Sequence, residues 1–397
     1  MDYNKLGMFI HWGIFAMTEH HEQALARADM SFDVYDEFPK SFNPKKYNPE
    51  KWVKFAKKCG MKYICFTTKH HDGFCMWDTK ETDYNIMNTP FKKDALKMLA
   101  DACKKHGMKL SLYYSNPDWH HENAYNEKAS HQWKSRYPER ADSVKYREFI
   151  KRQITELLTN YGEIYTLFWD ISPEMIDKSI NQLCRKLQPN ILINNRGYDD
   201  GDFDTPERDV PEGERFRKMT EACESVGEQA WGYRKNEDYM SIRYLKCSID
   251  KVMAMGGSYL LNVGPKVDGT FPKQAINSLR AVGDWYNRMN GALEEHEKSD
   301  FEFEFLFKNP CIVTQKNGKK YFHFYNGLRS NAVNLIKYPS VPKKAVFLNS
   351  GKEVGIRYET LPMHTNEDFI AVDPVVSFID IPCNDYPDEP MVLEVEF

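Results

Sequence analysis

Residues 63–74 read YICFTTKHHDGF, in which Tyr63–Thr67 are apolar or β-branched and His70, His71 and Asp72 follow within a few positions. Uninterrupted apolar runs of this length are typical of strands that are buried on both faces, as in a parallel sheet. Five further runs of the same kind occur in the first 300 residues: Leu6–Ile10, Leu110–Tyr114, Ile164–Trp169, Ile191–Asn194 and Tyr259–Val263.

Amphipathic stretches separate these runs. Asp94 is suited to cap a helix that Gly107 ends, and Val144–Leu158 carries apolar residues at helical spacing. Repeated alternation of strand and helix predicts an α/β fold, either a barrel or a doubly wound sheet. We find no Gly-rich phosphate-binding loop, which weakens the doubly wound alternative. The sequence therefore favours a (β/α)8-like TIM barrel.

The pattern changes after Met289. Residues 290–300 (NGALEEHEKSD) are polar and are expected to form a linker. Short strand-like runs then dominate, among them Cys311–Thr314, Lys320–Tyr325 and Met391–Phe397. Strands at this spacing without long helices between them predict a small antiparallel sandwich. We therefore expect two domains, a catalytic barrel over 1–295 and a C-terminal all-β sandwich over 296–397.

The composition excludes several classes of function. The 397 residues carry 54 Lys+Arg and 58 Asp+Glu, a balance that argues against binding nucleic acid or another polyanion. No apolar run approaches the roughly 18 residues of a membrane span, and the N-terminus has no signal-peptide pattern. We therefore expect no membrane association, and either a cytoplasmic protein or a trimmed secreted or periplasmic form. The oligomeric state, including a homo-oligomer, stays open.

Chemically distinctive side chains follow the end of each predicted strand. They are His11-Trp12, Lys69-His70-His71-Asp72, Tyr113-Tyr114-Ser115, Trp169-Asp170 and Asn194-Asn195-Arg196. In a barrel, side chains at the carboxyl ends of the strands meet at one face and form the active site. Aromatic faces stack on sugar rings and His, Asn and Arg bind hydroxyls, so the set fits a neutral polyhydroxylated substrate. Two carboxylates would supply the chemistry of glycosidic cleavage.

Seven motifs resemble the retaining α-L-fucosidase family. They are GMFIHWG (7–13), TKHHDGF (68–74), LYYS with DW (112–119), FWD (168–170), TPER (205–208), WGY (231–233) and LLNVGPxxDG (260–269). The resemblance covers the N-terminal 290 residues in order, and the C-terminal region is similar to that family's β-sandwich. It implies hydrolysis of terminal α-L-fucosyl linkages of oligosaccharides or glycoconjugates, through a covalent fucosyl-enzyme intermediate and without a metal or cofactor.

The resemblance also implies roles for individual residues. Asp170 matches the nucleophile, and Glu207 in GDFDTPE matches the acid/base, with Glu212 and Glu214 as alternatives because loop lengths vary in this region. The resemblance matches His11, His70, His71, Tyr113 and Arg196 to residues around the sugar ring, and we expect Trp12, Trp119 and Trp231 to form aromatic walls of the same substrate-binding site. Tyr114 is expected to face the packing layer, since adjacent strand residues point in opposite directions.

One departure from the family pattern concerns the loop after the first strand. Many members carry a Glu-Trp pair there, whereas this chain has His20-His21-Glu22-Gln23-Ala24. His21, Glu22 and Gln23 are the candidates to replace that contact with the sugar.

Two other functions compete with a glycosidase. The pairs His20-His21, His70-His71 and His120-His121 suggest a metal-dependent hydrolase, but neighbouring residues in a strand point apart and chelate one ion poorly. A carbohydrate-binding protein on an inactive barrel would lack one catalytic carboxylate, whereas this chain retains Asp170 and several glutamates.

Overall fold

The computed structural model describes residues 5–126, 128–299, 302–338, 340–360, 362–364, 369–371 and 374–397. Its N-terminal part contains a seven-stranded parallel sheet in the order β5-β4-β3-β2-β1-β7-β6. The strands are β1 (Leu6–Ile10), β2 (Tyr63–Lys69), β3 (Lys109–Ser115), β4 (Thr166–Asp170), β5 (Leu192–Ile193), β6 (Glu221–Ser225) and β7 (Ser258–Val263). All six predicted runs contribute to this sheet, so the parallel α/β prediction is confirmed.

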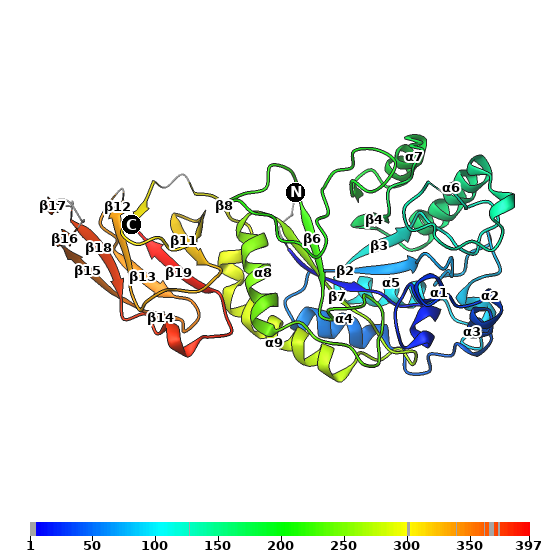
Figure 1. The fold of residues 1–397 in the computed structure, drawn as a ribbon, viewed down its shortest axis with the longest axis horizontal. Coiled ribbons are helices and arrows are strands. Elements are labelled where there is room, and N and C mark those ends of the chain that lie inside the picture. Colours follow the sequence, from blue (N-terminus) through cyan, green and yellow to red (C-terminus); the bar gives the residue numbers. More distant parts are fainter. Residues whose placement is uncertain are drawn as a thin grey trace.

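Helices flank the sheet in the order that the alternation predicts. They are α4 (Pro49–Lys58), α5 (Ala95–His106), α6 (Ser143–Asn160), α7 (Ser179–Leu187), α8 (Ile242–Ala254) and α9 (Lys273–Leu293), with the short α1 (Ala24–Arg27), α2 (Phe32–Tyr35) and α3 (Glu37–Ser41) before α4. Figure 1 shows α6 and α7 on one side of the strands and α4 and α9 on the other. Asp94 caps α5 by accepting the Lys97 N–H, and Gly107 ends it at a φ of 61°.

The sequence did not predict β6, because Glu221 and polar neighbours replace the apolar run that marks the other strands. Between β5 and β6 lies the segment 203–207, which forms isolated bridges to both. Asn194 pairs with Phe203 on the β5 side, and Glu207 pairs with Cys223 on the β6 side. The Cys223 N–H donates to the Pro206 carbonyl at 3.0 Å.

The two faces of the parallel sheet bury different sets of residues. One face carries Phe9, Tyr63, Cys65, Tyr113, Phe168, Cys223 and Leu260, which pack together as a small cluster. The other face packs against the helices in the main hydrophobic core. Tyr113 belongs to the first cluster and Tyr114 to the main core, so the expectation for Tyr114 is confirmed.

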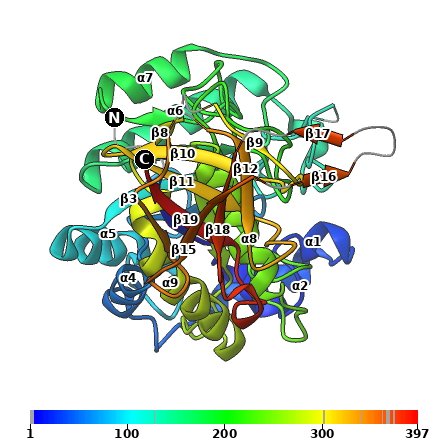
Figure 2. The same ribbon diagram turned by 90° about the vertical axis from the view of Figure 1, so that its left-hand side faces the viewer.

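The C-terminal part is built from antiparallel strands. A six-stranded sheet has the order β14-β13-β19-β11-β10-β8, a four-stranded sheet has the order β15-β18-β12-β9, and β16-β17 form a hairpin. The strands are β8 (Glu297–Lys298), β9 (Glu304–Phe305), β10 (Ile312–Lys316), β11 (Lys319–Phe324), β12 (Val333–Lys337), β13 (Lys344–Phe347), β14 (Lys352–Glu353), β15 (Gly355–Glu359), β16 (Pro362–His364), β17 (Phe369–Ala371), β18 (Val375–Ile379) and β19 (Met391–Glu396). Figure 2 shows the β16-β17 hairpin extending to one side of these sheets.

The two larger antiparallel sheets share a hydrophobic core, to which Phe322 and Leu393 contribute from one sheet and Leu335 and Phe378 from the other. The predicted linker over 290–300 is shorter in the structure, since α9 continues to Leu293 and β8 begins four residues later. Residue 300 lies outside the described residues.

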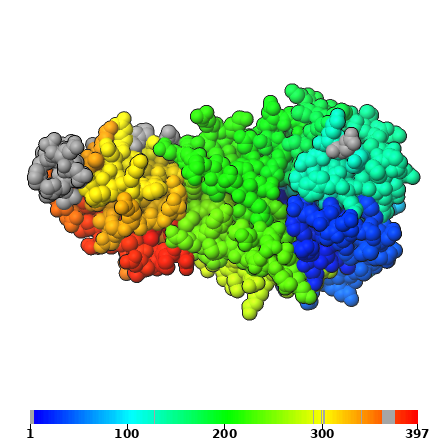
Figure 3. Space-filling view, in the orientation of Figure 1, coloured from blue at the N-terminus to red at the C-terminus, as the bar shows by residue number. Residues whose placement is uncertain are grey.

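The C-terminal strands lie at one end of the molecule, next to α8 and α9 (Figures 1 and 3). Asp250 of α8 and His323 of β11 are both fully buried and lie 2.9 Å apart, and Glu389 binds Lys246 and Arg288. In the part of the chain that the structure describes, no helix has both the length and the apolarity that crossing a membrane requires.

Candidate active site

A cavity opens at the carboxyl ends of the parallel strands. The side chains around it are Phe9, His11, Gln23, His70, His71, Tyr113, His131, Phe168, Asp170, Ile171, Arg196, Glu207, Cys223 and Trp231. The structure therefore brings together at one cavity eight of the residues expected at the site: Asp170, Glu207, His11, His70, His71, Tyr113, Arg196 and Trp231.

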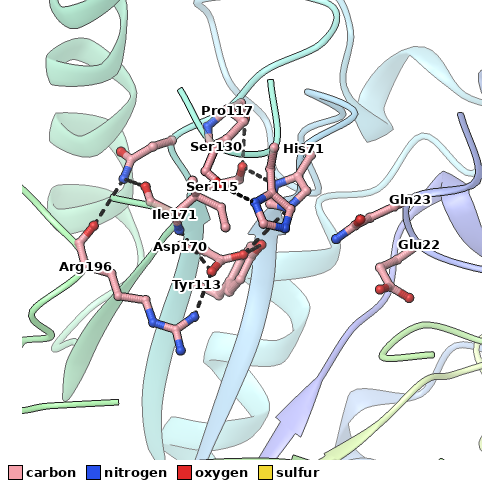
Figure 4. Close-up of polar contacts among 12 residues, drawn as sticks. Glu22, Gln23, His71, Tyr113, Ser115, Pro117, Ser130, Asp170, Ile171 and Arg196 are labelled. Carbon is pink, nitrogen blue, oxygen red and sulfur yellow. Dashed lines mark hydrogen bonds and ion pairs between the residues drawn. The ribbon is translucent and has the colours of Figure 1, made fainter. Parts of the chain in front are cut away.

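Asp170 is the last residue of β4 and its carboxylate is held from two sides. The Tyr113 hydroxyl donates to Oδ2 at 2.6 Å, and Arg196 Nη1 donates to Oδ1 at 3.1 Å (Figure 4). Burial acts to raise the pKa of this carboxyl, but the charge of Arg196 and the Tyr113 hydrogen bond bring the pKa below its usual value. Asp170 is therefore an ionised carboxylate at neutral pH.

Arg196 joins the two carboxyl groups of the site. Its Nη1 donates to Glu207 Oε2 at 2.7 Å as well as to Asp170, and its Nη2 donates to the Thr205 carbonyl at 2.8 Å. Because both acceptor oxygens contact one nitrogen, they lie at most about 6 Å apart, close to the spacing of a retaining glycosidase. The Glu207 side chain is 38% exposed and that of Asp170 is 14% exposed, so Glu207 is nearer to solvent.

The two alternatives to Glu207 lie elsewhere. The side chain of Glu212 is 90% exposed, and its carboxylate binds Lys251 of α8 at 2.9 Å. It does not line the cavity. Glu214 is exposed and is also outside the cavity lining. Of the three glutamates considered, the structure brings only Glu207 next to Asp170.

Two histidines are held in a defined protonation pattern. Asn262 uses its amide N–H groups on Ser225 and the Trp231 carbonyl, so its Oδ1 must accept from His11 Nδ1 at 2.7 Å. Ser115 donates to the Pro117 carbonyl at 2.7 Å, so its oxygen accepts from His71 Nδ1. Burial lowers the pKa of both histidines, and each therefore presents a neutral ring with Nε2 as an acceptor.

The expectation that adjacent histidines point apart is wrong for His70 and His71. Their ring centroids are only 4.2 Å apart, and both rings line the cavity. The reason is that β2 ends at Lys69, so the pair lies in the turn that follows and not in the strand. His70 Nδ1 is buried without a hydrogen-bond partner in the described part of the chain, and potential ligand atoms of His70, His71 and Asp170 lie within 4.8 Å of one another.

Trp12 and Trp119 do not line the cavity, which corrects their expected role as walls around the substrate. Trp12 is fully buried in the main core against Tyr47 and Trp52, because strand alternation turns it away from the face that carries His11. Trp119 is also fully buried, and its Nε1 donates to the His131 carbonyl at 2.8 Å. Trp119 therefore supports a cavity residue from behind.

The turn that carries the histidines rests on a buried ion pair. Lys69 is fully buried and its Nζ lies 2.9 Å from Asp118 Oδ2, while Asp118 Oδ1 accepts the N–H groups of His120 and His121. Gly73 in this turn has a φ of 78°, and a Cβ there would lie 2.2 Å from Asp118 Oδ1. The turn thus requires both a glycine and the adjacent carboxylate.

Sequence reasoning missed several residues of the cavity. Phe9 and Phe168 lie two residues before His11 and Asp170, so strand alternation was a signal that could have identified them. His131 and Ile171 come from irregular segments, in which both residues have a positive φ, and no sequence pattern marks them.

In the segment that replaces the Glu-Trp pair, Glu22 and Gln23 lie in different places: Glu22 binds backbone N–H groups and Gln23 lines the cavity. Glu22 is 1% exposed, and its Oε2 accepts the N–H groups of Trp231 and Gly232, each at 3.0 Å. Gln23 lines the cavity, and Figure 4 shows its side chain directed toward His71 and Asp170. His21 does not line the cavity.

Comparison with known proteins agrees with this geometry. The family model described as alpha-L-fucosidase matches residues 1–292. The chain is 26% identical over 318 residues to the plasma alpha-L-fucosidase of Homo sapiens, with 73% of this chain and 67% of that protein covered.

Solved structures give the same result. The alpha-L-fucosidase isoenzyme 1 from Paenibacillus thiaminolyticus is 31% identical, with a TM-score of 0.83 over 99% of this chain and 97% of that one. A covalent intermediate of a GH29 alpha-L-fucosidase from Bacteroides thetaiotaomicron, trapped with 2-fluoro-fucosyl fluoride, is 27% identical, with a TM-score of 0.78 over 99% of this chain and 94% of that one. The chain belongs to the alpha-L-fucosidase family of glycoside hydrolases.

Proposed function

We propose that this protein hydrolyses terminal α-L-fucosyl linkages by double displacement, with Asp170 as the nucleophile and Glu207 as the acid/base. The observation that carries the proposal is the sharing of Arg196 Nη1 by the two carboxyl groups, at 3.1 and 2.7 Å. Inverting enzymes need room for a water molecule between carboxyl groups that are about 6.5–9.5 Å apart, whereas this pair is closer.

The reaction then proceeds in two balanced steps. The Asp170 carboxylate attacks the anomeric carbon while the bond to the leaving oxygen breaks and Glu207 gives that oxygen its proton. In the second step Glu207 takes a proton from water, the water oxygen attacks the anomeric carbon, and the bond to Asp170 breaks. His11 and His71 present unprotonated Nε2 atoms that accept hydrogen bonds from sugar hydroxyls.

The nucleophile is tested with Asp170→Gly and azide. The variant is expected to lose at least about 10³-fold in kcat on 4-nitrophenyl α-L-fucoside, and azide is expected to restore turnover with formation of β-L-fucosyl azide. Full activity of Asp170→Gly without azide would refute the assignment. Release of another sugar but not of fucose from a panel of nitrophenyl glycosides would refute the function itself.

The acid/base is tested with Glu207→Ala. This variant is expected to lose far more activity on fucosyl oligosaccharides, whose leaving groups need protonation, than on 2,4-dinitrophenyl α-L-fucoside. Glu212→Ala and Glu214→Ala are the matched controls, and each is expected to behave as wild type. Should Glu207→Ala retain wild-type activity on oligosaccharides while one of the controls loses it, the role passes to that glutamate.

We also propose that the parallel sheet closes into a barrel and that the chain divides into a catalytic domain over 1–295 and a β-sandwich over 296–397. Closure is supported by the bridges of 203–207 to both edge strands. The division is supported by the separate core shared by the two larger antiparallel sheets. Hydrogen exchange on the Cys223 N–H offers a test, since a closed barrel predicts protection comparable to that of β7, and rapid exchange would contradict closure.

A metal-dependent hydrolase is the second candidate, because the ligand atoms of His70, His71 and Asp170 come within 4.8 Å of one another. Against it, Arg196 already places a positive charge 3.1 Å from the Asp170 carboxylate. Metal analysis of protein purified without added ions separates the two candidates. Stoichiometric zinc, with activity lost on chelation, would replace the glycosidase mechanism by a metal-assisted one.

A further inference from the structure

Next to the cavity-lining Gln23 lies an arginine that has no carboxylate partner among the described residues. Arg27 is the exposed last residue of α1, and its Nε donates to Gln23 Oε1 at 2.7 Å. Its guanidinium lies over the ring of Trp133, 5.4 Å from the centroid. Within the described ranges, neither terminal nitrogen of Arg27 has a hydrogen bond or ion pair to a protein group.

Both neighbours of Arg27 lead directly into the cavity. Gln23 lines the cavity and is 8% exposed, so its amide connects the guanidinium to the region of Asp170. The Trp133 ring also packs against the His131 ring, with their centroids 4.4 Å apart. His131 lines the cavity as well. Arg27 therefore lies one side chain outside the space assigned to fucose.

The loop that presents Trp133 is held by buried groups. Trp119 fixes the His131 carbonyl, and the side chain of Gln132 is buried between the backbone of Asp118 and that of Lys134. Trp133 nevertheless remains 55% exposed. A ligand that contacts this rim would thus meet a surface whose backbone is already ordered, which lowers the entropic cost of binding.

Carboxylates close in sequence to Arg27 are engaged elsewhere. Asp29 is 94% exposed and accepts a hydrogen bond from Lys134 Nζ at 2.7 Å. Glu22 is buried, with Oε2 bound to two backbone N–H groups. The charge of Arg27 is consequently available to a ligand.

We propose that Arg27, positioned by Gln23 and Trp133, binds an anionic group on the part of the substrate that follows fucose. The chemical class is a fucoside whose adjacent residue carries a carboxylate or a sulfate ester. The edge of a guanidinium presents paired N–H donors that match the oxygens of such groups, and the aromatic ring holds the plane of the guanidinium in place. The inference rests on the proposed fucosidase activity, because it assumes that fucose fills the cavity and that the aglycone projects from its mouth.

The test uses pairs of disaccharides that differ only in charge. One pair is α-L-fucosyl-glucuronic acid and α-L-fucosyl-glucose, and the other is α-L-fucosyl-N-acetylglucosamine with and without a 6-O-sulfate, each prepared in several linkages. Inhibition constants against 4-nitrophenyl α-L-fucoside hydrolysis are measured for every compound, whether or not it is cleaved. The wild type is expected to bind at least one anionic member about 5- to 20-fold more tightly than its neutral partner. The preference should shrink at high salt, and comparison of the pairs distinguishes carboxylate from sulfate.

Variants assign the effect to Arg27. Arg27→Met is expected to abolish the preference, and Arg27→Lys to keep part of it, because lysine retains the charge but not the paired donors. Arg140→Met is the matched control: Arg140 is also exposed and lies over an aromatic ring, but it binds Glu122 at 3.1 Å. Its removal should leave the preference unchanged.

Two outcomes would overturn the inference. One is equal affinity of the wild type for the charged and neutral members of both pairs, and the other is a preference that survives in Arg27→Met. Absence of any fucoside hydrolysis is a different result, which would defeat the proposed function itself.

Discussion

Replacing Tyr113 by Phe removes one hydrogen bond from the carboxylate that we propose as the nucleophile. The Tyr113 hydroxyl lies 2.6 Å from Asp170 Oδ2. Burial raises the pKa of Asp170, and the charge of Arg196 together with this hydrogen bond brings the pKa below its usual value. Without the hydroxyl, burial is opposed mainly by Arg196, so the pKa of Asp170 rises.

The size of the effect follows from the type of bond. A hydrogen bond to a charged group contributes about 1.5–3 kcal/mol, and one pKa unit corresponds to about 1.36 kcal/mol. Losing the bond weakens the ionised form of Asp170 by about this free energy, so its pKa should rise. Because the carboxylate is the proposed attacking form, the acid limb of the kcat/KM profile should move to higher pH, with a smaller loss at neutral pH.

The assay is the pH dependence of kcat/KM for 4-nitrophenyl α-L-fucoside, with circular dichroism at each pH to show that the protein remains folded. Tyr114→Phe is the matched control, since it removes the neighbouring hydroxyl on the same strand, which binds Gln153 at 2.6 Å on the opposite face. Its acid limb should coincide with that of the wild type. An unmoved acid limb in Tyr113→Phe would refute the reasoning, because the hydroxyl would then have no influence on the reactive carboxylate.

Three further substitutions test how the site is supported. Asp118→Asn leaves Lys69 charged and buried and should reduce the free energy of unfolding by about 3–5 kcal/mol in urea titrations. Burial acts to raise the pKa of Asp118, but Lys69 holds this pKa below its usual value. The wild type should therefore lose the stabilisation by the ion pair as the pH falls, whereas the variant has none to lose. Equal acid sensitivity of the two proteins would argue against the ion pair. Trp12→Phe should reduce the free energy of unfolding by about 2–3 kcal/mol without changing KM, because Trp12 packs in the core. A raised KM would show that Trp12 contributes to substrate binding after all. Gly73→Ala should cost about 2–4 kcal/mol, because its φ of 78° is left-handed and its Cβ would displace Asp118; thermal unfolding at the wild-type temperature would contradict this.

Much of the parallel sheet could be predicted from sequence because its strands are buried on both faces. Such strands tolerate few polar residues and leave a continuous apolar run, which is how Leu6–Ile10 and Tyr259–Val263 were identified. β6 lacks this signal, because Glu221 faces the interior and binds the Tyr63 hydroxyl at 2.5 Å. Burial raises the pKa of Glu221 to about 7. A buried carboxyl of this kind is recognised only once its partner, 158 residues away in the sequence, is known.

The roles of Asp170 and Glu207 remain predictions, although the structure places both at one cavity. Their proximity was predictable only in part. Asp170 ends a recognisable strand, whereas Glu207 lies in a segment without regular structure among several other glutamates. Arg196 contacts the carboxylates of both Asp170 and Glu207. This contact favours Glu207 over the exposed alternative Glu212, whose carboxylate binds Lys251.

The sequence by itself determined six of the seven parallel strands, their alternation with helices, the antiparallel C-terminal part and the chemistry at the strand ends, because these depend on local periodicity and on residue type. Only the tertiary structure decided which side chains face the cavity. Trp12 packs in the core, and the side chains of His70 and His71 both line the cavity. Gln23 and His131 reach the cavity from irregular segments. The physical reason is that loop conformation depends on contacts with distant residues, such as the bond from Trp119 to the His131 carbonyl, which no local pattern records.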